Sequence, residues 1–337
     1  MQRTFTKGWV GAAGGILVAA AHAAPATYAP HATLAERAHA AQAVASGAPQ
    51  CQEAQPFYWE IGDGRTVLAS GQSGAHGPTA QTKLQIASAS KWIYGAYVAE
   101  RRGGSLTQDD IRFLNFQSGY TGFRMCRKGQ TVEECQSSLL NHRGKQDPDT
   151  IGHFYYSGGH MQEHAVLMGL GKLDNEGLAS AIKQGLGKVG AAWDLSYSQP
   201  QLAGGAQSNA ADYGQFLRAM VRGDLKISGL LGAHPVCTNP QACPGDALKT
   251  PIPPNEAWHY SIGHWVEDDP VVGDGAFSSP GAFGFYPWID AARRYYGIVA
   301  REERKGIFSD APDGKPAVRS VECGRLIREA WESGHAP

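Results

Sequence analysis

The stretch IASASKWIYGAYVAERRGG, residues 86–104, decides the fold. Ser88 and Lys91 are three positions apart, and on a helix that spacing puts both side chains on one face. Apolar residues recur at helical spacing after Lys91, and Gly103-Gly104 supplies a stop signal. The stretch therefore predicts a helix that begins close to Ser88 and ends before the two glycines.

The residues around Ser88 have the chemistry of an activated nucleophile. A free hydroxyl is a poor nucleophile, but a lysine held away from water can lose its proton and act as a base. The unpaired N–H groups at a helix start can hold a developing oxyanion. The same spacing recurs at Ser180 and Lys183, but inside a helical pattern, so we interpret Ser180 as part of a partly solvated helix face.

The rest of the chain alternates between strand and helix signals. Aromatic and β-branched stretches flank Gly62-Asp63-Gly64, which indicates a hairpin, and the pattern over residues 111–232 is mostly helical. Strand signals return at 258–268, 281–290 and 295–303, and a helix closes the chain at 320–333. This order predicts an α/β (α+β) fold, an antiparallel sheet flanked by helices with an inserted all-helical domain.

The predicted domain at 51–337 has two parts. We expect a sheet subdomain at about 51–110 and 257–337, and a helical subdomain at about 111–256. A cleft between them is the default ligand site. Lys and Arg total 30 and Asp and Glu total 31, so the net charge is close to zero. The chain as a whole therefore has no positive electrostatic field that would attract nucleic acid or an acidic membrane surface. We expect a small-molecule partner, and the oligomeric state stays open.

The N-terminal residues indicate export. Arg3 and Lys7 precede an apolar run too short to span a bilayer, and small residues follow it, so residues 1–23 read as a signal peptide cleaved near Ala23. Residues 24–50 are an Ala- and Pro-rich leader or edge helix, with a possible short helix at 32–44. We expect a periplasmic or extracellular protein whose mature chain is not stably inserted in a membrane.

Five segments, in order, resemble those of class C β-lactamases and their esterase relatives, within the serine β-lactamase and penicillin-binding-protein superfamily. They cover most of residues 57–303, and the order is harder to obtain by chance than any one match. The segments are IASASKWI (86–93), DIRFLNFQSGYTG (110–122), FYYSGGHMQEHAVLMGLG (154–171), AGGAQSNAADYGQFLRAM (203–220) and SSPGAFGFYPWID (278–290).

The resemblance implies a role for each matching residue. Ser88 takes the place of the nucleophile and Lys91 that of the neighbouring base. Tyr156 takes the place of the family tyrosine, whose phenol or phenolate moves the proton between serine, lysine and leaving group. Tyr155 carries a phenol too and is an equal candidate by residue type. We choose Tyr156 because it directly precedes Ser-Gly.

Two positions depart from the family pattern. The asparagine expected after the tyrosine is Gly158, and the third motif, usually Lys-Thr-Gly or His-x-Gly, reads Ser279-Pro280-Gly281. A hydroxyl thus replaces the cation that receives an acidic substrate group. Gly281 lets substrate approach the strand, and the N–H of Ala282 becomes the second oxyanion donor. Lys249-Thr250 lacks the following glycine, and we interpret it as a loop coincidence.

A rival site lies at His160, Glu163 and His164, which have the HxxEH spacing of inverted zinc peptidases. Both histidines would share a helix face, and the glutamate could polarise a metal-bound water. Such a site also needs a carboxylate ligand from a later helix. The competing interpretation is a pair of surface histidines, and the preferred mechanism requires no metal or cofactor.

The expected function is an exported serine hydrolase that cleaves a carboxylic ester or amide through an acyl-enzyme on Ser88, as in family VIII carboxylesterases and nylon-oligomer hydrolases, which share this fold. A β-lactamase or D-alanyl-D-alanine carboxypeptidase is one alternative, and a zinc peptidase or a non-catalytic binding relative is another.

Six cysteines in an exported chain indicate disulfides rather than a metal cluster, because the chain has no CxxC pair. Sequence proximity suggests Cys126–Cys135 and Cys237–Cys243. The family fold brings the terminal elements together and so suggests Cys51–Cys323. Six cysteines permit about 15 pairings, and the connectivity is otherwise open.

Overall fold

The computed structural model describes residues 32–190, 192–305 and 315–336, and residues Ala32–Pro337 form one compact unit. The predicted signal peptide, with the first residues of the leader, lies outside the described residues. Within the described residues, no helix has both the length and the apolar character needed to cross a bilayer.

An antiparallel sheet of eight strands organises the unit, as predicted. Its spatial order is β2-β1-β13-β12-β11-β10-β9-β7, so β1 from the N-terminal part pairs with β13 from the C-terminal part, one strand in from the β2 edge. The strands are β1 (Phe57–Gly62), β2 (Val67–Ser73), β7 (Val236–Cys237), β9 (His259–Ser261), β10 (His264–Glu267), β11 (Ala276–Ser278), β12 (Tyr286–Ile289) and β13 (Tyr296–Ala300).

The hairpin of β1 and β2 forms where the sequence predicted it. All six residues of β1 are buried, and they are mainly aromatic and β-branched residues that suit a strand. Asp63 closes the turn because its Oδ1 accepts hydrogen bonds from the N–H groups of Arg65 and Thr66, at 2.7 and 2.9 Å. The first hairpin of the sheet could therefore be predicted from the local sequence.

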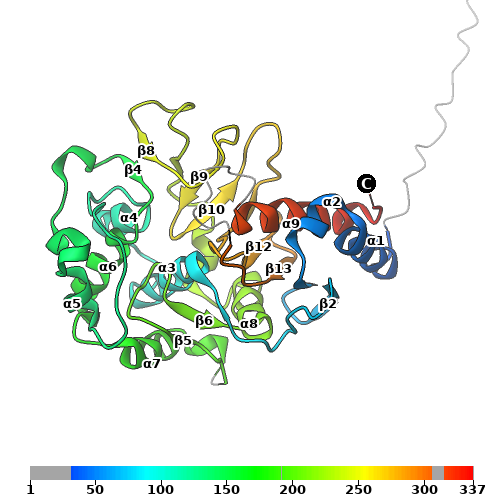
Figure 1. Cartoon of the computed structure of the whole chain (residues 1–337), viewed down its shortest axis with the longest axis horizontal. Helices are drawn as coiled ribbons and strands as arrows, with labels where there is room; N and C mark the ends of the chain where they lie inside the picture. Colours follow the sequence, from blue (N-terminus) through cyan, green and yellow to red (C-terminus); the bar gives the residue numbers. More distant parts are fainter. Residues whose placement is uncertain (1–31, 191, 306–314, 337) are drawn as a thin grey trace, which may run out of the picture. The chain divides into compact units, whose positions relative to one another are not determined.

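Helices cover both faces of the sheet (Figure 1). Helix α9 (Pro316–Ser333) packs on β12 and β13, and α8 (Ala210–Val221) packs on β1, β12 and β13 from the opposite face. Tyr296 faces α8 while Val299 faces α9, as strand alternation requires. Two further helices, α1 (Leu34–Gly47) and α2 (Pro49–Ala54), lie against α9, so the predicted edge helix is a packed part of this layer.

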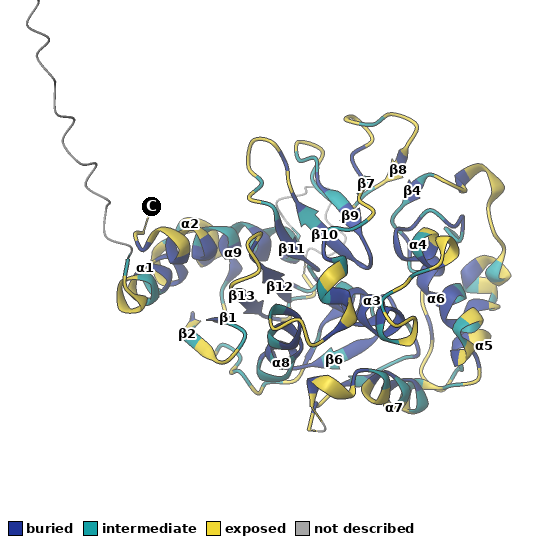
Figure 2. Cartoon of the chain, turned by 180° about the vertical axis from the view of Figure 1, so that it is seen from behind, coloured by how far each residue is buried: buried dark blue, intermediate teal, exposed yellow. Residues whose placement is uncertain are grey.

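Residues 84–249 contain mostly helices, and the best buried is α3 (Ser90–Arg101), in which residues 90–99 are all buried (Figure 2). It ends where Gly103 and Gly104 adopt positive φ, as the glycine pair predicted. The other helices of this part are α4 (Gln108–Leu114), α5 (Val132–Gln136), α6 (Gly159–Ala165) and α7 (Asn175–Gly185). Ser180 and Lys183 are exposed on α7, which confirms the interpretation of the second SxxK match.

Short strands interrupt this helical part. Strands β3 (Leu84–Gln85), β6 (Ala206–Ser208) and β5 (Ser196–Tyr197) form one small sheet, and β4 (Phe154–Tyr155) pairs with β8 (Ala247–Lys249) in parallel. The interpretation of Lys249 as a loop residue was therefore wrong, because it ends β8. The division into two subdomains stays a prediction.

The three disulfides confirm the expected pairs: Cys51–Cys323, Cys126–Cys135 and Cys237–Cys243. The first joins α2 to α9 across 272 positions of sequence and fixes the N-terminal helices to the C-terminal one. The other two close short loops of the chain.

Candidate active site

Ser88 lies in a turn of 3-10 helix (Ala87–Ala89) that leads directly into α3. Ala87 has φ +45°, a conformation that costs an L-residue energy and that surrounding contacts must maintain. The hydroxyl of Ser90 donates to the carbonyl of Ala87 at 2.6 Å, and the N–H of Ala206 donates to the same hydroxyl at 3.2 Å. These buried bonds fix the turn that presents Ser88.

The amine of Lys91 lies beside the Ser88 hydroxyl. Its Nζ is 2.8 Å from Oγ of Ser88 and donates to the carbonyl of Ala203 at 2.6 Å. Lys91 is only 4% exposed, and burial lowers its pKa to about 7. The amine is therefore neutral in a substantial fraction of molecules at neutral pH. The Ala203 carbonyl can take one amine hydrogen and leave the nitrogen lone pair facing Ser88.

Tyr156 lies against the same pair of residues. Nζ of Lys91 is 4.8 Å from the centroid of its ring, which stacks on Trp265 at 5.4 Å. Burial raises the pKa of Tyr156 to about 12, although hydrogen bonding with Ser88 and Trp265 acts in the opposite direction. The phenol is therefore protonated at neutral pH and can donate a hydrogen bond. Tyr155 lines a different pocket.

The third-motif residues take different positions around Ser88. The Ser279 hydroxyl donates to the backbone carbonyl of Ser88 at 3.0 Å, and Ser279 is only 2% exposed. A Cβ at Gly281 would lie 2.3 Å from the carbonyl oxygen of Ile86, so chain packing by itself requires glycine there. Ala282 lines the same pocket as Ser88, and its N–H donates no hydrogen bond within the described residues.

The packing around Gly158 explains why an asparagine is absent there. A Cβ at this position would lie 2.9 Å from Cδ1 and 3.0 Å from Cε1 of Phe123. Gly158 itself has φ −69°, which any residue can adopt, so the restriction comes from the neighbouring ring. The Phe123 ring therefore lies where an asparagine side chain would begin.

The pocket at Ser88 has a volume of about 200 Å³ and a mostly apolar wall. Ser88, Tyr156 and Ala282 line it, and most of the other residues come from the loop before β9, from β10 and from α9. They include Ile252, Trp258, Trp265, Val318 and Val321. Sequence reasoning missed these residues. The strand signal at 258–268 placed Trp258 and Trp265 in a predicted strand, but gave no indication that they line a pocket.

Two carboxylates, Glu256 and Glu322, line this mostly apolar pocket. Oε2 of Glu256 accepts hydrogen bonds from Nη2 of Arg325 and from Nε1 of Trp258, each at 2.7 Å. The Arg325 guanidinium also lies 4.9 Å from the centroid of the Trp258 ring. These contacts fix the Trp258 indole in the wall and offset the charge of Glu256.

The histidines of the HxxEH match are buried, so the interpretation as surface histidines was wrong. Nδ1 of His160 contacts the Ser118 hydroxyl at 2.7 Å, and its Nε2 contacts the carbonyl of Tyr155 at 3.0 Å. His164 contacts the Tyr94 hydroxyl and the Asp110 carboxylate through its two nitrogens, at 3.1 and 3.0 Å. All four ring nitrogens have protein partners.

Burial lowers the pKa of His160 to about 3, which keeps its imidazole neutral. Within the described ranges, no group of three or more His, Cys, Asp or Glu side chains is arranged to hold a metal ion. The contacts of His160 and His164 are those of core residues, and they give the zinc-peptidase alternative no geometric support.

Comparison with known proteins gives a fold-level likeness. No protein-family model matches the sequence, and no curated protein matches it. Several solved structures resemble this one over most of the chain. A putative β-lactamase from Bacteroides dorei has a TM-score of 0.57 at 17% identity and covers 81% of this chain and 93% of its own.

A D-amino acid amidase from Ochrobactrum anthropi has a TM-score of 0.59 at 14% identity, covering 81% of this chain and 95% of its own. A D-stereospecific amidohydrolase from Streptomyces sp. has a TM-score of 0.57 at 14% identity, covering 90% and 100%. At these identities the likeness concerns the fold alone, and this chain shares its fold with these three proteins.

Proposed function

We propose that the protein is a serine hydrolase that cleaves a carboxylic ester or amide through an acyl-enzyme on Ser88. The single observation that carries the proposal is the buried Lys91 amine, 2.8 Å from the Ser88 hydroxyl and with its pKa lowered to about 7. A neutral amine at hydrogen-bonding distance is the base that a serine nucleophile needs. The fold supports the same conclusion, since two of the similar structures are named as an amidase and an amidohydrolase.

The first half of the proposed reaction acylates Ser88. Lys91 takes the Ser88 proton as Oγ attacks the substrate carbonyl carbon, and the carbonyl π electrons move onto oxygen. The N–H groups of Ser88 and Ala282 are the proposed donors to that oxyanion. When the oxyanion collapses, the bond to the leaving group breaks, and the proton passes from the Lys91 ammonium to the leaving group with the Tyr156 hydroxyl as relay.

The second half hydrolyses the acyl-enzyme. Lys91, neutral again, takes a proton from a water molecule as the water oxygen attacks the acyl carbon. Collapse of this second intermediate breaks the bond to Oγ, and the proton on Lys91 returns to Ser88 as the carboxylic acid leaves. Tyr156 acts throughout as a hydrogen-bond donor and relay rather than as the resting base, because its pKa of about 12 keeps it protonated.

The pocket supports an uncharged, apolar group next to the scissile bond. Trp258, Ile252 and Val321 contribute apolar wall, and the Glu256 carboxylate is already held by Arg325. Among the described residues that line the pocket, Lys315 is the one lysine or arginine. A substrate carboxylate at this place would also meet Glu256 and Glu322, and Ser279 offers it no cation. A β-lactamase or carboxypeptidase activity, which needs recognition of a substrate carboxylate, is therefore the weaker proposal.

The test is labelling with a fluorophosphonate probe, which reacts with activated serines. Full-length wild-type protein should be labelled once, on Ser88, and Ser88→Ala should not be labelled. Ser180→Ala is the matched control, because Ser180 has the same SxxK spacing on an exposed helix face, and it should be labelled like wild type. Equal labelling of Ser88→Ala, or no labelling of folded wild type, would refute the proposal.

Export remains part of the proposal. Three disulfides are typical of proteins in oxidising compartments, and the structure is compatible with that location. N-terminal sequencing of the protein from the culture medium or periplasm should find a mature chain that begins near residue 24.

A further inference from the structure

A second pocket, with a volume of about 590 Å³, lies beside Tyr155. Three of its lining residues carry basic side chains: Arg124, His142 and Lys145. The one acidic side chain of the lining is Asp147, whose Oδ1 accepts a hydrogen bond from the N–H of Asp149 at 3.2 Å. We call Arg124, His142 and Lys145 the cationic cluster.

Within the described ranges, the side chains of the cationic cluster form no ion pair and no side-chain hydrogen bond. Some other exposed cations of the chain do form ion pairs, such as Lys83 with Asp194 at 2.7 Å. Unpaired cations gathered around one concavity raise the local concentration of anions there.

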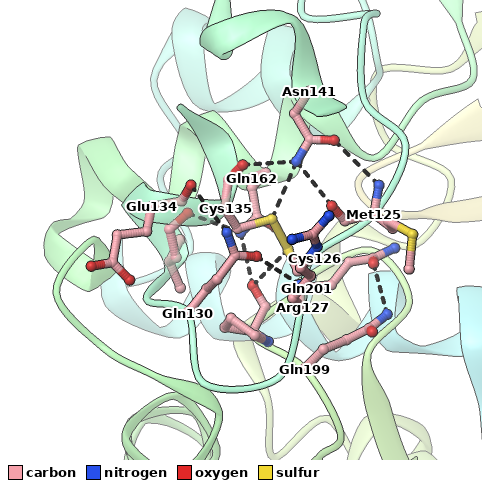
Figure 3. The surroundings of a disulfide bond; sticks show 12 residues. Met125, Cys126, Arg127, Gln130, Glu134, Cys135, Asn141, Gln162, Gln199 and Gln201 are labelled. Atoms are coloured by element: carbon pink, nitrogen blue, oxygen red, sulfur yellow. Dashed lines mark hydrogen bonds between the residues drawn. A yellow bond between two sulfur atoms is a disulfide. The ribbon is translucent and has the colours of Figure 1, made fainter. Parts of the chain in front are cut away.

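Buried contacts hold the two loops that carry the cluster. Asn141 is 3% exposed, and its Oδ1 accepts hydrogen bonds from the N–H groups of Arg124 and Met125, at 2.8 and 3.2 Å. Its Nδ2 donates to the carbonyls of Met125 and Cys135, at 3.1 and 2.8 Å (Figure 3). One buried amide therefore fixes the backbone at Arg124 relative to the turn that carries His142.

The neighbouring chain is fixed by two further features. The disulfide Cys126–Cys135 closes the loop just after Arg124 (Figure 3). His142 adopts φ +50°, and its ring packs so closely that a Cβ at Gly122 would lie 2.5 Å from Nδ1. The backbone that bears the cluster is thus set before any ligand arrives, which lowers the ordering cost of binding.

We propose that the cationic cluster binds an oxyanion, a carboxylate or a phosphate. Arg124 offers the planar fork of donors that fits two oxygens of such a group, while Lys145 adds a point charge and His142 a further N–H donor. The site is separate from the Ser88 pocket, although the two are lined by neighbouring residues, Tyr155 and Tyr156. The anion is either a remote group of the substrate or a free ion.

Binding of inorganic phosphate tests the site without using hydrolysis. Sodium phosphate should raise the Tm of the full-length protein saturably, beyond sodium chloride at the same ionic strength. The double variant R124Q/K145Q should bind phosphate at least tenfold more weakly. The control R65Q/K183Q removes the same charge from exposed positions elsewhere and should bind like wild type. If R124Q/K145Q does not fold, Lys145→Gln alone, at an exposed position, should still show weaker binding.

Kinetics then separate the two sources of the anion, and this arm rests on the proposed hydrolase function. A pair of esters is compared that differ only in a carboxylate remote from the scissile bond. If the substrate supplies the anion, R124Q/K145Q raises KM for the acidic ester alone, and phosphate competes with that ester. If a free ion occupies the site, phosphate binds but the two esters behave alike. Phosphate binding that is absent in wild type, or equal in wild type and R124Q/K145Q, overturns the site even if hydrolysis is found.

Discussion

The hydroxyl of Ser279 donates a hydrogen bond to the backbone carbonyl of Ser88 at 3.0 Å, across 191 positions of sequence. Ser279 directly follows strand β11, so this bond ties the end of an inner strand of the sheet to the turn that presents the nucleophile. Ser279, which the sequence resemblance predicts in the place of a substrate-binding cation, is buried, and its hydroxyl faces the backbone of Ser88. We therefore propose that it positions Ser88 instead of receiving a substrate group.

Ser279→Ala should lower kcat by roughly fivefold with little change in KM, because one hydrogen bond to the nucleophile turn, worth about 1 kcal/mol, is lost. Steady-state kinetics on a neutral ester measure the two constants. Ser279→Thr retains the hydroxyl and should recover part of the rate. A rise in KM for acidic esters alone would instead identify Ser279 as a substrate-binding group.

The rate should depend on pH through Lys91. Its pKa of about 7 means that the amine is protonated below this value and cannot accept the Ser88 proton. We expect kcat/KM to rise about tenfold per pH unit on the acid side and to level off above pH 7 to 8. Tyr156 stays protonated across this range, so it adds no second transition. Initial rates between pH 5 and 9 test this, and a flat profile contradicts Lys91 as the base. Lys91→Arg should be inactive throughout.

Lys91 should also lower stability in a pH-dependent way. The folded protein holds its pKa near 7, below the ordinary value of 10.5, so between these values the unfolded chain binds more protons. The free energy of unfolding should therefore rise with pH in this window, by up to about 1.4 kcal/mol per unit. Lys91→Met removes the titrating amine and with it this pH dependence of the free energy of unfolding. The variant should be more stable than wild type at pH 7, and urea unfolding should find a difference that shrinks toward pH 10.

The sequence predicted elements whose signals are local. The hairpin around Asp63, the helix start at Ser88 and the strands from residue 258 onward each have a period or a turn residue that marks them. The proximity of Ser88 and Lys91 could be predicted for the same reason, because the two residues are one helical turn apart in sequence. In the structure, Nζ of Lys91 lies 2.8 Å from Oγ of Ser88.

Contacts that depend on tertiary packing could not be predicted from the sequence. The carbonyl of Ala203 holds Lys91 from 112 positions away, and a backbone carbonyl has no sequence signature. Trp265 stacks on Tyr156 because two separate segments meet at the site. His160 and His164 matched a metal motif by spacing, whereas burial against Ser118 and Asp110 decides what they contact.

Removing the disulfide Cys51–Cys323 should destabilise the protein more than removing Cys237–Cys243. The first closes a loop of 272 positions and the second a loop of 6, so the loop-entropy model predicts losses of about 5 and about 2 kcal/mol. Paired Cys→Ala variants and urea unfolding of each measure the difference. Equal losses would mean that the long-range bond does not act by restricting the unfolded chain.

Restoring the family asparagine at residue 158 should fail unless Phe123 is also changed. A Cβ at Gly158 would lie 2.9 Å from the Phe123 ring, so Gly158→Asn should lower the free energy of unfolding by about 1–3 kcal/mol through overpacking. Phe123→Ala should remove that clash while losing its own packing. The double variant should therefore be more stable than the sum of the two single effects predicts.

Urea unfolding of the four proteins in this cycle measures the coupling between residues 123 and 158. Gly158→Ala is the control for the clash, because it adds only the Cβ and should show a smaller loss than asparagine. Additive effects of the two substitutions would mean that the Phe123 ring moves aside freely. In that case its position would not explain why glycine replaces asparagine beside Tyr156, and the departure from the family pattern would have to be assigned to the substrate instead of to packing.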